Sequence, residues 1–433
     1  MKIELAYGKA ELAVELPEQA RATVIRKPEF PAPSMPSDII EQALANPVDA
    51  LPLEQLAKQR RSACILICDF TRPVPNGLFL QPMIRRLISA GIPADKITVL
   101  IATGLHRPNE GEELKALVAD PWVLENVTVE NHFATRDEDH VDLGVTATRG
   151  TPVSIDRRFV EAELRIATGL VEPHFMAGYS GGRKVVAPGI AGHKTIRTFH
   201  SARFMEDPHA VQCNLSQNPL HEEQLEIVRM VGEIYALNTV LDENRRLVFA
   251  TFGEVIASHL AAVEFTRAYT EIPVGRKFKT VVTSSAGYPL DETYYQTVKG
   301  MVTPLDILEP GGTLIIASRC AEGIGSPHFR AAQERLVQLG PDAFLKTLQA
   351  KQLADVDEWQ TEMQLKPMRL GSIMLYSDGL SDADYAVTGV ERADSVEAAI
   401  AQSIARHNDP EIAVIPEGPY VVPFAGTTAQ VSG

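Results

Sequence analysis

Apolar residues in the first half of the chain fall in short runs separated by segments of helical periodicity. The runs predict strands at residues 63–68, 97–102, 127–131 and 164–168. Between them, residues 78–90 and 112–118 have the spacing of amphipathic helices. Buried strands that alternate with helices predict a parallel sheet with helices on both faces.

The same pattern begins again after a change of composition at residues 270–280. It predicts strands at 280–284, 311–317, 371–376 and 411–415. We therefore expect two α/β domains with parallel-type sheets, because 433 residues are too many for one ordinary core. The expected boundaries are 1–270 for the first domain and 276–415 for the second, with residues 416–433 packing back on the first.

The N-terminal residues differ from both domains in their pattern. Residues 1–26 alternate between apolar and polar side chains, with a turn at Gly8-Lys9, and predict a β-hairpin. This start lacks the apolar core of a signal peptide.

Composition narrows the kinds of partner. The net charge of -15 argues against nucleic acid, because binding phosphate backbones needs clustered Lys and Arg. No apolar run approaches about 18 residues, so no transmembrane helix is expected. The four cysteines are widely spread, which fits a reducing compartment, and we expect a cytoplasmic protein.

Polar side chains follow three of the predicted strands of the first domain. Asp69 and Arg72 follow strand 63–68, His106 follows strand 97–102, and His174 follows strand 164–168. Ligands of parallel sheets bind beyond the carboxyl ends of the strands. Arg72 could bind a carboxylate and Asp69 a ribose hydroxyl, or the two could form a salt bridge. The two histidines could act as bases on either side of a substrate carbon, or each could be structural.

The stretch from 171 to 200 has the most unusual composition, with five glycines within 15 residues. Such a loop can approach a ligand closely and bind anions through its N–H groups. Within it, Lys184 lies between Gly181-Gly182 and Val185-Val186, where partial desolvation would make it a nucleophile or a covalent anchor. The alternatives are a plain tight turn and an exposed lysine. The stretch matches neither the Walker A motif nor the G-x-G-x-x-G fingerprint.

A fourth polar segment, residues 287–300, follows the first strand of the second domain. If the second domain closes onto the first, this segment would cover a substrate in the cleft between them. Taken alone, it is an ordinary helix start with Asp291 near the N-cap.

These segments together resemble the nickel-dependent lactate racemase family. The shared motifs are D-F-T-R-P at 69–73, A-T-G-L-H-R at 102–107, E-P-H-F-x-A-G-Y-S-G-G-R-K-x-x-x-P-G at 172–189 with His200 after it, and P-L-D-x-x-x-Y-Q-x-x-K-G at 289–300. They occur in family order. The resemblance implies an isomerase of two domains with its active site in the cleft between them.

The resemblance also implies a cofactor, a nickel-pincer nucleotide derived from nicotinic acid. Its pyridinium ring would be joined to Lys184 by a thioamide, and His200 would be the protein's nickel ligand. Cofactor contacts are expected at Asp69, Ser180, Pro188 and Tyr295. Dedicated maturation enzymes load this cofactor, so the protein expressed without them would lack it.

For the reaction, the resemblance implies racemisation or epimerisation of a 2-hydroxy acid by reversible hydride transfer. His106 and His174 would be the two acid/base residues, and Arg72, Gln296 and Lys299 would bind the substrate. One histidine would remove the hydroxyl proton while hydride leaves C2 for the cofactor. The planar 2-keto acid would then turn and take hydride back on its other face.

The substrate and two other classes of function stay open at this point. The family includes enzymes for lactate, malate, aromatic hydroxy acids and sugar acids such as gluconate. Met176 would suit an apolar substituent, whereas Arg107, Arg183 or Lys194 could serve a second carboxylate or the cofactor phosphate. The first rival is a nucleotide-binding protein without turnover. The second is an NAD-dependent dehydrogenase, but the nearest fingerprint, residues 323–328, lacks its third glycine. The sequence leaves the oligomeric state unknown.

Overall fold

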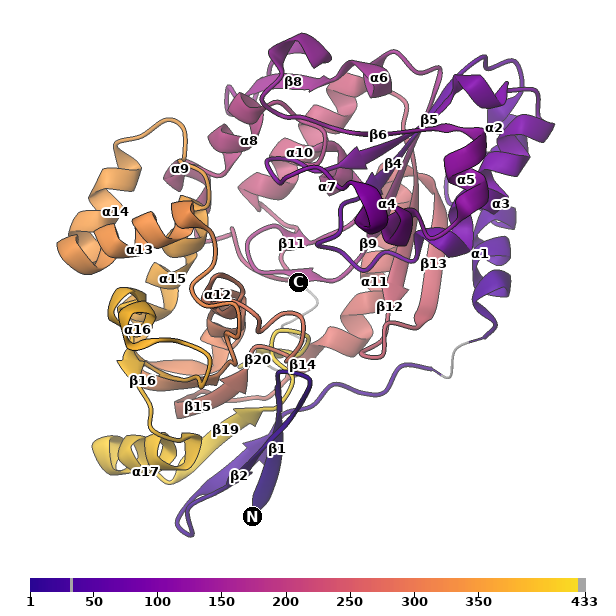
Figure 1. The fold of residues 1–433 in the computed structure, drawn as a ribbon. Helices are drawn as coiled ribbons and strands as arrows, with labels where there is room; N and C mark the ends of the chain where they lie inside the picture. The colour runs from indigo at the N-terminus through magenta and orange to yellow at the C-terminus, as the bar shows by residue number, and fades with distance from the viewer. Residues whose placement is uncertain (32–33, 427–433) are drawn as a thin grey trace. The chain divides into compact units, whose positions relative to one another are not determined.

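The chain folds into two α/β units, each built around a six-stranded sheet, as the sequence predicts (Figure 1). The structure is a computed structural model that describes residues 1–31 and 34–426. Unit 1 comprises residues 1–28, 201–206 and 269–433, and unit 2 comprises residues 29–200 and 207–268. Nothing is described for residues 427–433, the end of the expected C-terminal tail.

The sheet of unit 2 has the strand order β13-β12-β9-β4-β5-β6. Its strands are β4 (Ala63–Cys68), β5 (Ile97–Ala102), β6 (Thr128–Asn131), β9 (Leu164–Leu170), β12 (Tyr235–Leu241) and β13 (Leu247–Glu254). All neighbours are parallel except β12 and β13, which form an antiparallel pair. The four strands predicted in this region are confirmed, and β12 and β13 extend the sheet beyond the prediction.

Helices cover both faces of this sheet (Figure 1). On one face lie α1 (Pro36–Ala45), α2 (Leu53–Ala57) and α3 (Asn76–Ser89), which share an apolar core with the strands. The other helices of unit 2 are α4 (Gly111–Val118), α5 (Pro121–Asn126), α6 (Arg157–Val160), α7 (Arg183–Val186), α8 (His193–Phe199), α10 (Pro219–Val231) and α11 (Val255–Thr270). Two small hairpins complete the unit, β7 (His140–Val145) with β8 (Pro152–Asp156) and β10 (Pro173–His174) with β11 (Gly178–Tyr179).

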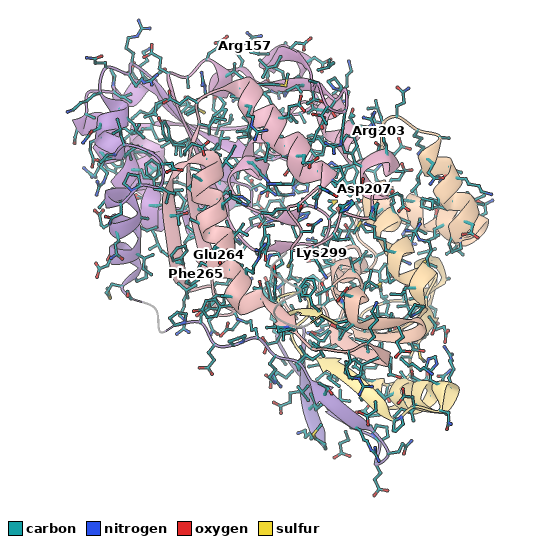
Figure 2. All side chains as sticks on the ribbon, turned by 180° about the vertical axis from the view of Figure 1, so that it is seen from behind. Arg157, Arg203, Asp207, Glu264, Phe265 and Lys299 are labelled. Carbon is teal, nitrogen blue, oxygen red and sulfur yellow. The ribbon has the colours of Figure 1, made fainter. Side chains whose placement is uncertain are left out.

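Phe265 anchors α11 within unit 2 and is labelled in Figure 2. Its ring stacks on Phe249 of β13, with the ring centroids 4.1 Å apart, and also on Phe30. These stacked rings attach the helix and the start of unit 2 to the antiparallel edge of the sheet.

The sheet of unit 1 is parallel throughout, with the order β18-β17-β16-β15-β19-β3. Its strands are β3 (Arg21–Val24), β15 (Phe278–Ser284), β16 (Leu308–Ala317), β17 (Ser372–Tyr376), β18 (Glu391–Arg392) and β19 (Glu411–Ile415). Its helices are α9 (Ala202–Met205), α12 (Tyr294–Val302), α13 (Pro327–Leu339), α14 (Pro341–Gln349), α15 (Glu358–Leu370), α16 (Asp382–Thr388) and α17 (Val396–His407). The predicted strands of the second domain are confirmed.

Residues 1–28 and 416–426 belong to unit 1, which differs from the expected boundaries. The predicted hairpin is present as β1 (Lys2–Tyr7) and β2 (Ala10–Glu15), and its apolar face packs into the core of unit 1. Near the end of the described residues, β20 (Val422–Phe424) pairs with β14 (Glu271–Pro273) in unit 1.

One further finding concerns membranes. Among the residues that the structure describes, no helix is long and apolar enough to cross a bilayer.

The hairpin turn depends on Gly8. Its φ of +55° is strained for other residues, and a Cβ there would lie 2.7 Å from Cδ of Arg319. We expect Gly8→Ala to lower the free energy of unfolding by about 1–3 kcal/mol more than Gly275→Ala does. Gly275 is the matched control, because it also has a positive φ but nothing lies within 4 Å of its added Cβ. Equal losses in urea unfolding of the two variants would contradict this packing account.

Candidate active site

The order of strands in unit 2 creates a place for a ligand at one edge of the sheet. From β4 the chain moves outward through β5 and β6, and it then returns to the other side of β4 to form β9 and β12. The loops after β4 and β9 therefore diverge, and such a switch point is where open α/β sheets bind ligands. Asp69 and Arg72 follow β4, His174 follows β9, and His106 follows the adjacent β5.

Asp69 and His106 form the first pair at this edge. Oδ2 of Asp69 lies 2.6 Å from Nδ1 of His106, and Oδ1 accepts a hydrogen bond of 2.6 Å from the Thr71 hydroxyl. Burial on its own raises the pKa of Asp69, but the bonds from His106 and Thr71 outweigh it and hold the pKa below its usual value. An ionised Asp69 accepts the Nδ1 proton of His106, so the electron pair of a neutral His106 is on Nε2.

Arg72 is paired with a residue that the sequence analysis passed over. Its Nε lies 3.9 Å from Oε1 of Glu172, and its Nη1 donates to the Thr71 carbonyl at 3.0 Å. The salt bridge between Arg72 and Asp69, one of the two alternatives, is not formed, because His106 takes the Asp69 carboxylate. Glu172 is the first residue of the E-P-H motif, two residues before His174, and this position in the sequence could have identified it as a site residue.

His174 and Lys184 form the second pair. Nζ of Lys184 lies 3.2 Å from Nε2 of His174. Both groups are donors when they are protonated, so this contact needs an electron pair on one of the two nitrogens. The two residues are brought together by the β10–β11 hairpin, which returns the chain from His174 to Gly178, and by α7, which begins one residue before Lys184.

His200 follows the last residue of α8 and is buried. Its Nδ1 donates to the Ile196 carbonyl at 2.8 Å, so the electron pair is on Nε2. Burial, with a smaller contribution from the charge of Lys184, lowers the pKa of His200 to about 4. The imidazole is therefore neutral at pH 7, the form that binds metals.

The side chains of this site could give a metal only part of its ligands. Within residues 1–31 and 34–426, no three His, Cys, Asp or Glu side chains group as a metal site. A metal at His200 would therefore need other donors from a bound cofactor.

Ser180 and Pro188 are part of the loop that carries Lys184. The Ser180 hydroxyl donates to the Leu170 carbonyl at 2.6 Å and accepts from the Glu172 N–H at 3.0 Å. Pro188 follows a cis peptide bond and is half-buried. Ser180 thus ties the loop to the end of β9, and its predicted cofactor contact stays a prediction.

The stretch after Pro188 is fixed by a buried histidine. His132 contacts Asp156 through Nδ1 at 2.9 Å and the Ala191 carbonyl through Nε2 at 3.1 Å. Arg158 also donates to both oxygens of Asp156. Burial alone would raise the pKa of Asp156, but the bonds from Arg158 and His132 lower it to about 2.

The other predicted site residues belong to unit 1. Tyr295, Gln296 and Lys299 lie on α12, and Lys299 is labelled in Figure 2. Gln296 and Lys299 are three residues apart and so share a side of the helix. The Thr293 side chain caps the helix by accepting from the Gln296 N–H, and Gln360 of α15 donates to the Tyr295 carbonyl at 2.6 Å.

Arg107 does not offer a guanidinium for a second carboxylate. Its two terminal nitrogens donate to the Glu113 carboxylate at 2.8 and 2.7 Å, and it lies over the Phe70 ring. The hydrogen bond of Asp69 to His106 and the stacking of Phe70 with Arg107 thus join the same two loops.

Two family models together match most of the chain. The model of the lactate racemase N-terminal domain matches residues 7–212, and that of the lactate racemase C-terminal domain matches residues 275–422. The chain belongs to the lactate racemase family. The resemblance inferred from the motifs is thereby confirmed, and with it an isomerase of two α/β domains.

Curated relatives agree over nearly their full length. The lactate racemase of Thermoanaerobacterium thermosaccharolyticum is 31% identical over 97% of this chain and 98% of its own. The lactate racemase of Lactiplantibacillus plantarum is 30% identical over 96% of this chain and 98% of its own.

Solved structures share the fold. The structure of the lactate racemase apoprotein from T. thermosaccharolyticum matches with a TM-score of 0.90 and 29% identity, over 98% of this chain and 100% of that one. A protein from Thermotoga maritima matches with a TM-score of 0.66 at 16% identity, over 91% of this chain and 99% of its own, which shows a shared fold alone.

The Asp156 cluster generates a test of stability. Because the pKa of Asp156 is lower in the folded chain, its contribution is present above its unfolded pKa and lost as pH falls toward about 2. We expect Asp156→Asn to lower the free energy of unfolding by about 3–5 kcal/mol at pH 7, since Arg158 loses its buried partner. In urea unfolding, the difference in the free energy of unfolding between Asp156→Asn and the wild-type protein should shrink as the pH falls below about 4. A difference independent of pH would contradict this account.

Proposed function

We propose that this chain racemises 2-hydroxy acids of the lactate type. The observation that carries the proposal is the 3.2 Å contact between Lys184 and His174 at the switch point of the unit 2 sheet. A lysine amine that can pass its proton to a neighbouring imidazole is suited to form a covalent bond with a cofactor. The histidine beside it is suited to transfer protons to and from a substrate. The names of the two curated relatives support lactate as the substrate.

The residues present fit a nickel-pincer nucleotide. Lys184 would hold it through a thioamide, and His200 would bind the nickel through Nε2, the nitrogen that carries the electron pair. The neutral state of His200 and the need for donors from outside the protein both agree with such a group. When bound, this cofactor supplies a reversible hydride acceptor.

The acid/base work falls to two histidines held in different ways. His106 is oriented by the ionised Asp69, so its Nε2 can take the hydroxyl proton of one enantiomer. Nε2 of His174 faces Nζ of Lys184 at 3.2 Å, and the Ala177 N–H lies 3.3 Å from Nδ1 on the other side of the ring. Each histidine would remove the proton of one enantiomer and return it to the other.

Arg72 would bind the substrate carboxylate. Its guanidinium is held through Nε by Glu172 and through Nη1 by the Thr71 carbonyl. A carboxylate can then pair with this fixed cation while C2 is presented to the histidines. Gln296 and Lys299 of α12 are proposed as further substrate contacts, and Asp69, Ser180, Pro188 and Tyr295 as cofactor contacts.

Two features of the cellular setting are part of the proposal. Dedicated maturation enzymes would load the cofactor, because Lys184 must be joined to it covalently. A cytoplasmic location is supported by the small number and wide spacing of the four cysteines.

Single-enantiomer substrates test the activity. Protein co-expressed with the maturation enzymes should convert L-lactate and D-lactate to the same mixture, followed by chiral chromatography. His106→Ala and His174→Ala should each abolish conversion in both directions, because one proton transfer is lost either way. An unchanged rate in either variant removes that histidine from the mechanism, and conversion only of malate or an aromatic hydroxy acid moves the substrate to that class.

Asp69→Asn tests how His106 is oriented. Loss of the carboxylate should lower kcat by about 10²–10⁴, because an amide no longer fixes the histidine tautomer. Asp142→Asn is the matched control, since Asp142 is exposed and accepts a hydrogen bond from the Gly144 N–H within its own hairpin, away from any histidine that it could orient. A wild-type rate in Asp69→Asn would show that Asp69 does not orient the histidine.

A further inference from the structure

Arg183 is among the largest fully buried side chains of the protein, with 1% of its surface exposed. Its Nη2 donates to the carbonyls of Ala177 and Tyr179, at 3.0 and 2.9 Å. Its Nη1 lies 2.8 Å from Nε2 of His259. Both terminal nitrogens of the guanidinium are therefore engaged inside unit 2, whereas Nε is buried without a hydrogen-bond partner among the described residues. This contradicts the interpretation that Arg183 serves a second carboxylate or a phosphate.

No carboxylate pairs with this cation in the part of the chain that the structure describes. Burial lowers the pKa of Arg183 to about 9, and no acidic group opposes that effect. A buried charge without a counter-ion is costly, and an apolar side chain of similar length would avoid the cost. Arg183 must therefore stabilise the structure in a way that an apolar side chain of similar length could not.

This stabilisation comes from the hydrogen bonds that Arg183 donates to two carbonyls of its own loop. The carbonyls of Ala177 and Tyr179 belong to the segment between His174 and Lys184, and Arg183 directly precedes Lys184. A planar guanidinium with several fixed donors can hold two carbonyls and an imidazole at once. The Arg183 side chain thus links the middle of this segment, at Ala177 and Tyr179, to its end beside Lys184.

His259 of α11 contacts both Arg183 and the loop backbone through one ring nitrogen. Its Nε2 lies 2.8 Å from both Nη1 of Arg183, a donor, and the Ser180 carbonyl, an acceptor. A guanidinium can only donate and a carbonyl can only accept, so Nε2 accepts from Arg183 when the ring proton is on Nδ1 and donates to Ser180 when it is on Nε2. Nδ1 of His259 is buried without a hydrogen-bond partner among the described residues, so Nε2 is the nitrogen through which this ring is joined to the loop.

The glycine turn before Arg183 fits tightly against the same surroundings. The Gly182 N–H donates to Oδ1 of Asn238 at 2.9 Å. Gly181 has a φ of +103°, and a Cβ there would lie 2.5 Å from Val171 and 3.0 Å from His259. The turn therefore has little room to shift while Arg183 and His259 stay in place.

We propose that Arg183 and His259 are positioning residues that clamp residues 177–184 and so keep Nζ of Lys184 beside Nε2 of His174. This inference rests on the proposed function, in which Lys184 is the covalent anchor. His259 joins the clamp to α11 through Nε2, which contacts both Arg183 and the Ser180 carbonyl.

Amide hydrogen exchange of the full-length protein without cofactor tests the clamp directly. In Arg183→Met and His259→Leu, peptides that span residues 175–186 should exchange at least about tenfold faster, because the loop opens locally. In His259→Gln they should exchange at the wild-type rate, because the glutamine amide replaces Nε2 in its contacts with Arg183 and the Ser180 carbonyl. Arg165→Met is the matched control, because Arg165 also donates to backbone carbonyls but follows Leu164 at the other end of β9.

Three outcomes overturn the clamp. The first is exchange in Arg183→Met as slow as in Arg165→Met. The second is exchange in His259→Gln as fast as in His259→Leu. The third concerns function: co-expressed with the maturation enzymes, variants with a loosened loop should show kcat about 100-fold lower with KM little changed. If kcat stays at the wild-type value although the loop exchanges faster, the positioning role is wrong.

Failure of the proposed function gives a different result. Wild-type protein that carries no adduct on Lys184 after co-expression would contradict the anchor. The exchange rates of the cofactor-free protein would still decide whether the clamp exists.

Discussion

The contact between Lys184 and His174 is the constraint on which the rest of the site depends. Nζ of Lys184 and Nε2 of His174 are held 3.2 Å apart, so a hydrogen bond between them needs an electron pair on one of the two nitrogens. The sheet makes this possible, because β9 ends at the switch point and the β10–β11 hairpin returns the chain to α7. Without further contacts, the loop between them would allow His174 and Lys184 to move apart. The hydrogen bonds made by this loop limit that movement.

The electrostatics of unit 2 separate two kinds of titratable group. Asp69 and Asp156 are kept ionised by hydrogen bonds that outweigh burial, and each orients a histidine. His200 and His259 are kept neutral by burial, and the bond from Nδ1 of His200 to the Ile196 carbonyl leaves its electron pair on Nε2. Charged carboxylates thus orient imidazoles that donate a proton to them, whereas burial keeps other imidazoles uncharged. The same side-chain type performs distinct tasks because its partners differ.

Much of the fold and of the site could be predicted from sequence, for reasons that particular residues make clear. Apolar runs such as 63–68 and 97–102 report burial on both faces of a parallel strand, and β4 and β5 form there. Asp69, His106 and His174 could be proposed because strand ends in such sheets carry ligand-binding groups. The roles of Lys184 and His200 depended on the family motifs, since a lysine and a histidine alone have many fates.

Other features depend on contacts between residues far apart in sequence. The hairpin of residues 1–26 was predicted, but its membership in unit 1 follows from Leu5 and Val14, which pack against strands of that sheet. From the sequence, Arg183 was a candidate to bind a second carboxylate or the cofactor phosphate, and only its burial against Ala177, Tyr179 and His259 shows otherwise. Glu172 lay inside a recognised motif, yet its partner Arg72 is 100 residues earlier in the numbering.

The central claim is that Lys184 anchors the cofactor at the switch point of unit 2. Peptide-mapping mass spectrometry of protein co-expressed with the maturation enzymes tests it most directly. The account predicts a mass adduct on the peptide that contains Lys184, together with bound nickel that is lost in His200→Ala. An unmodified Lys184 peptide in protein that racemises lactate would contradict the account.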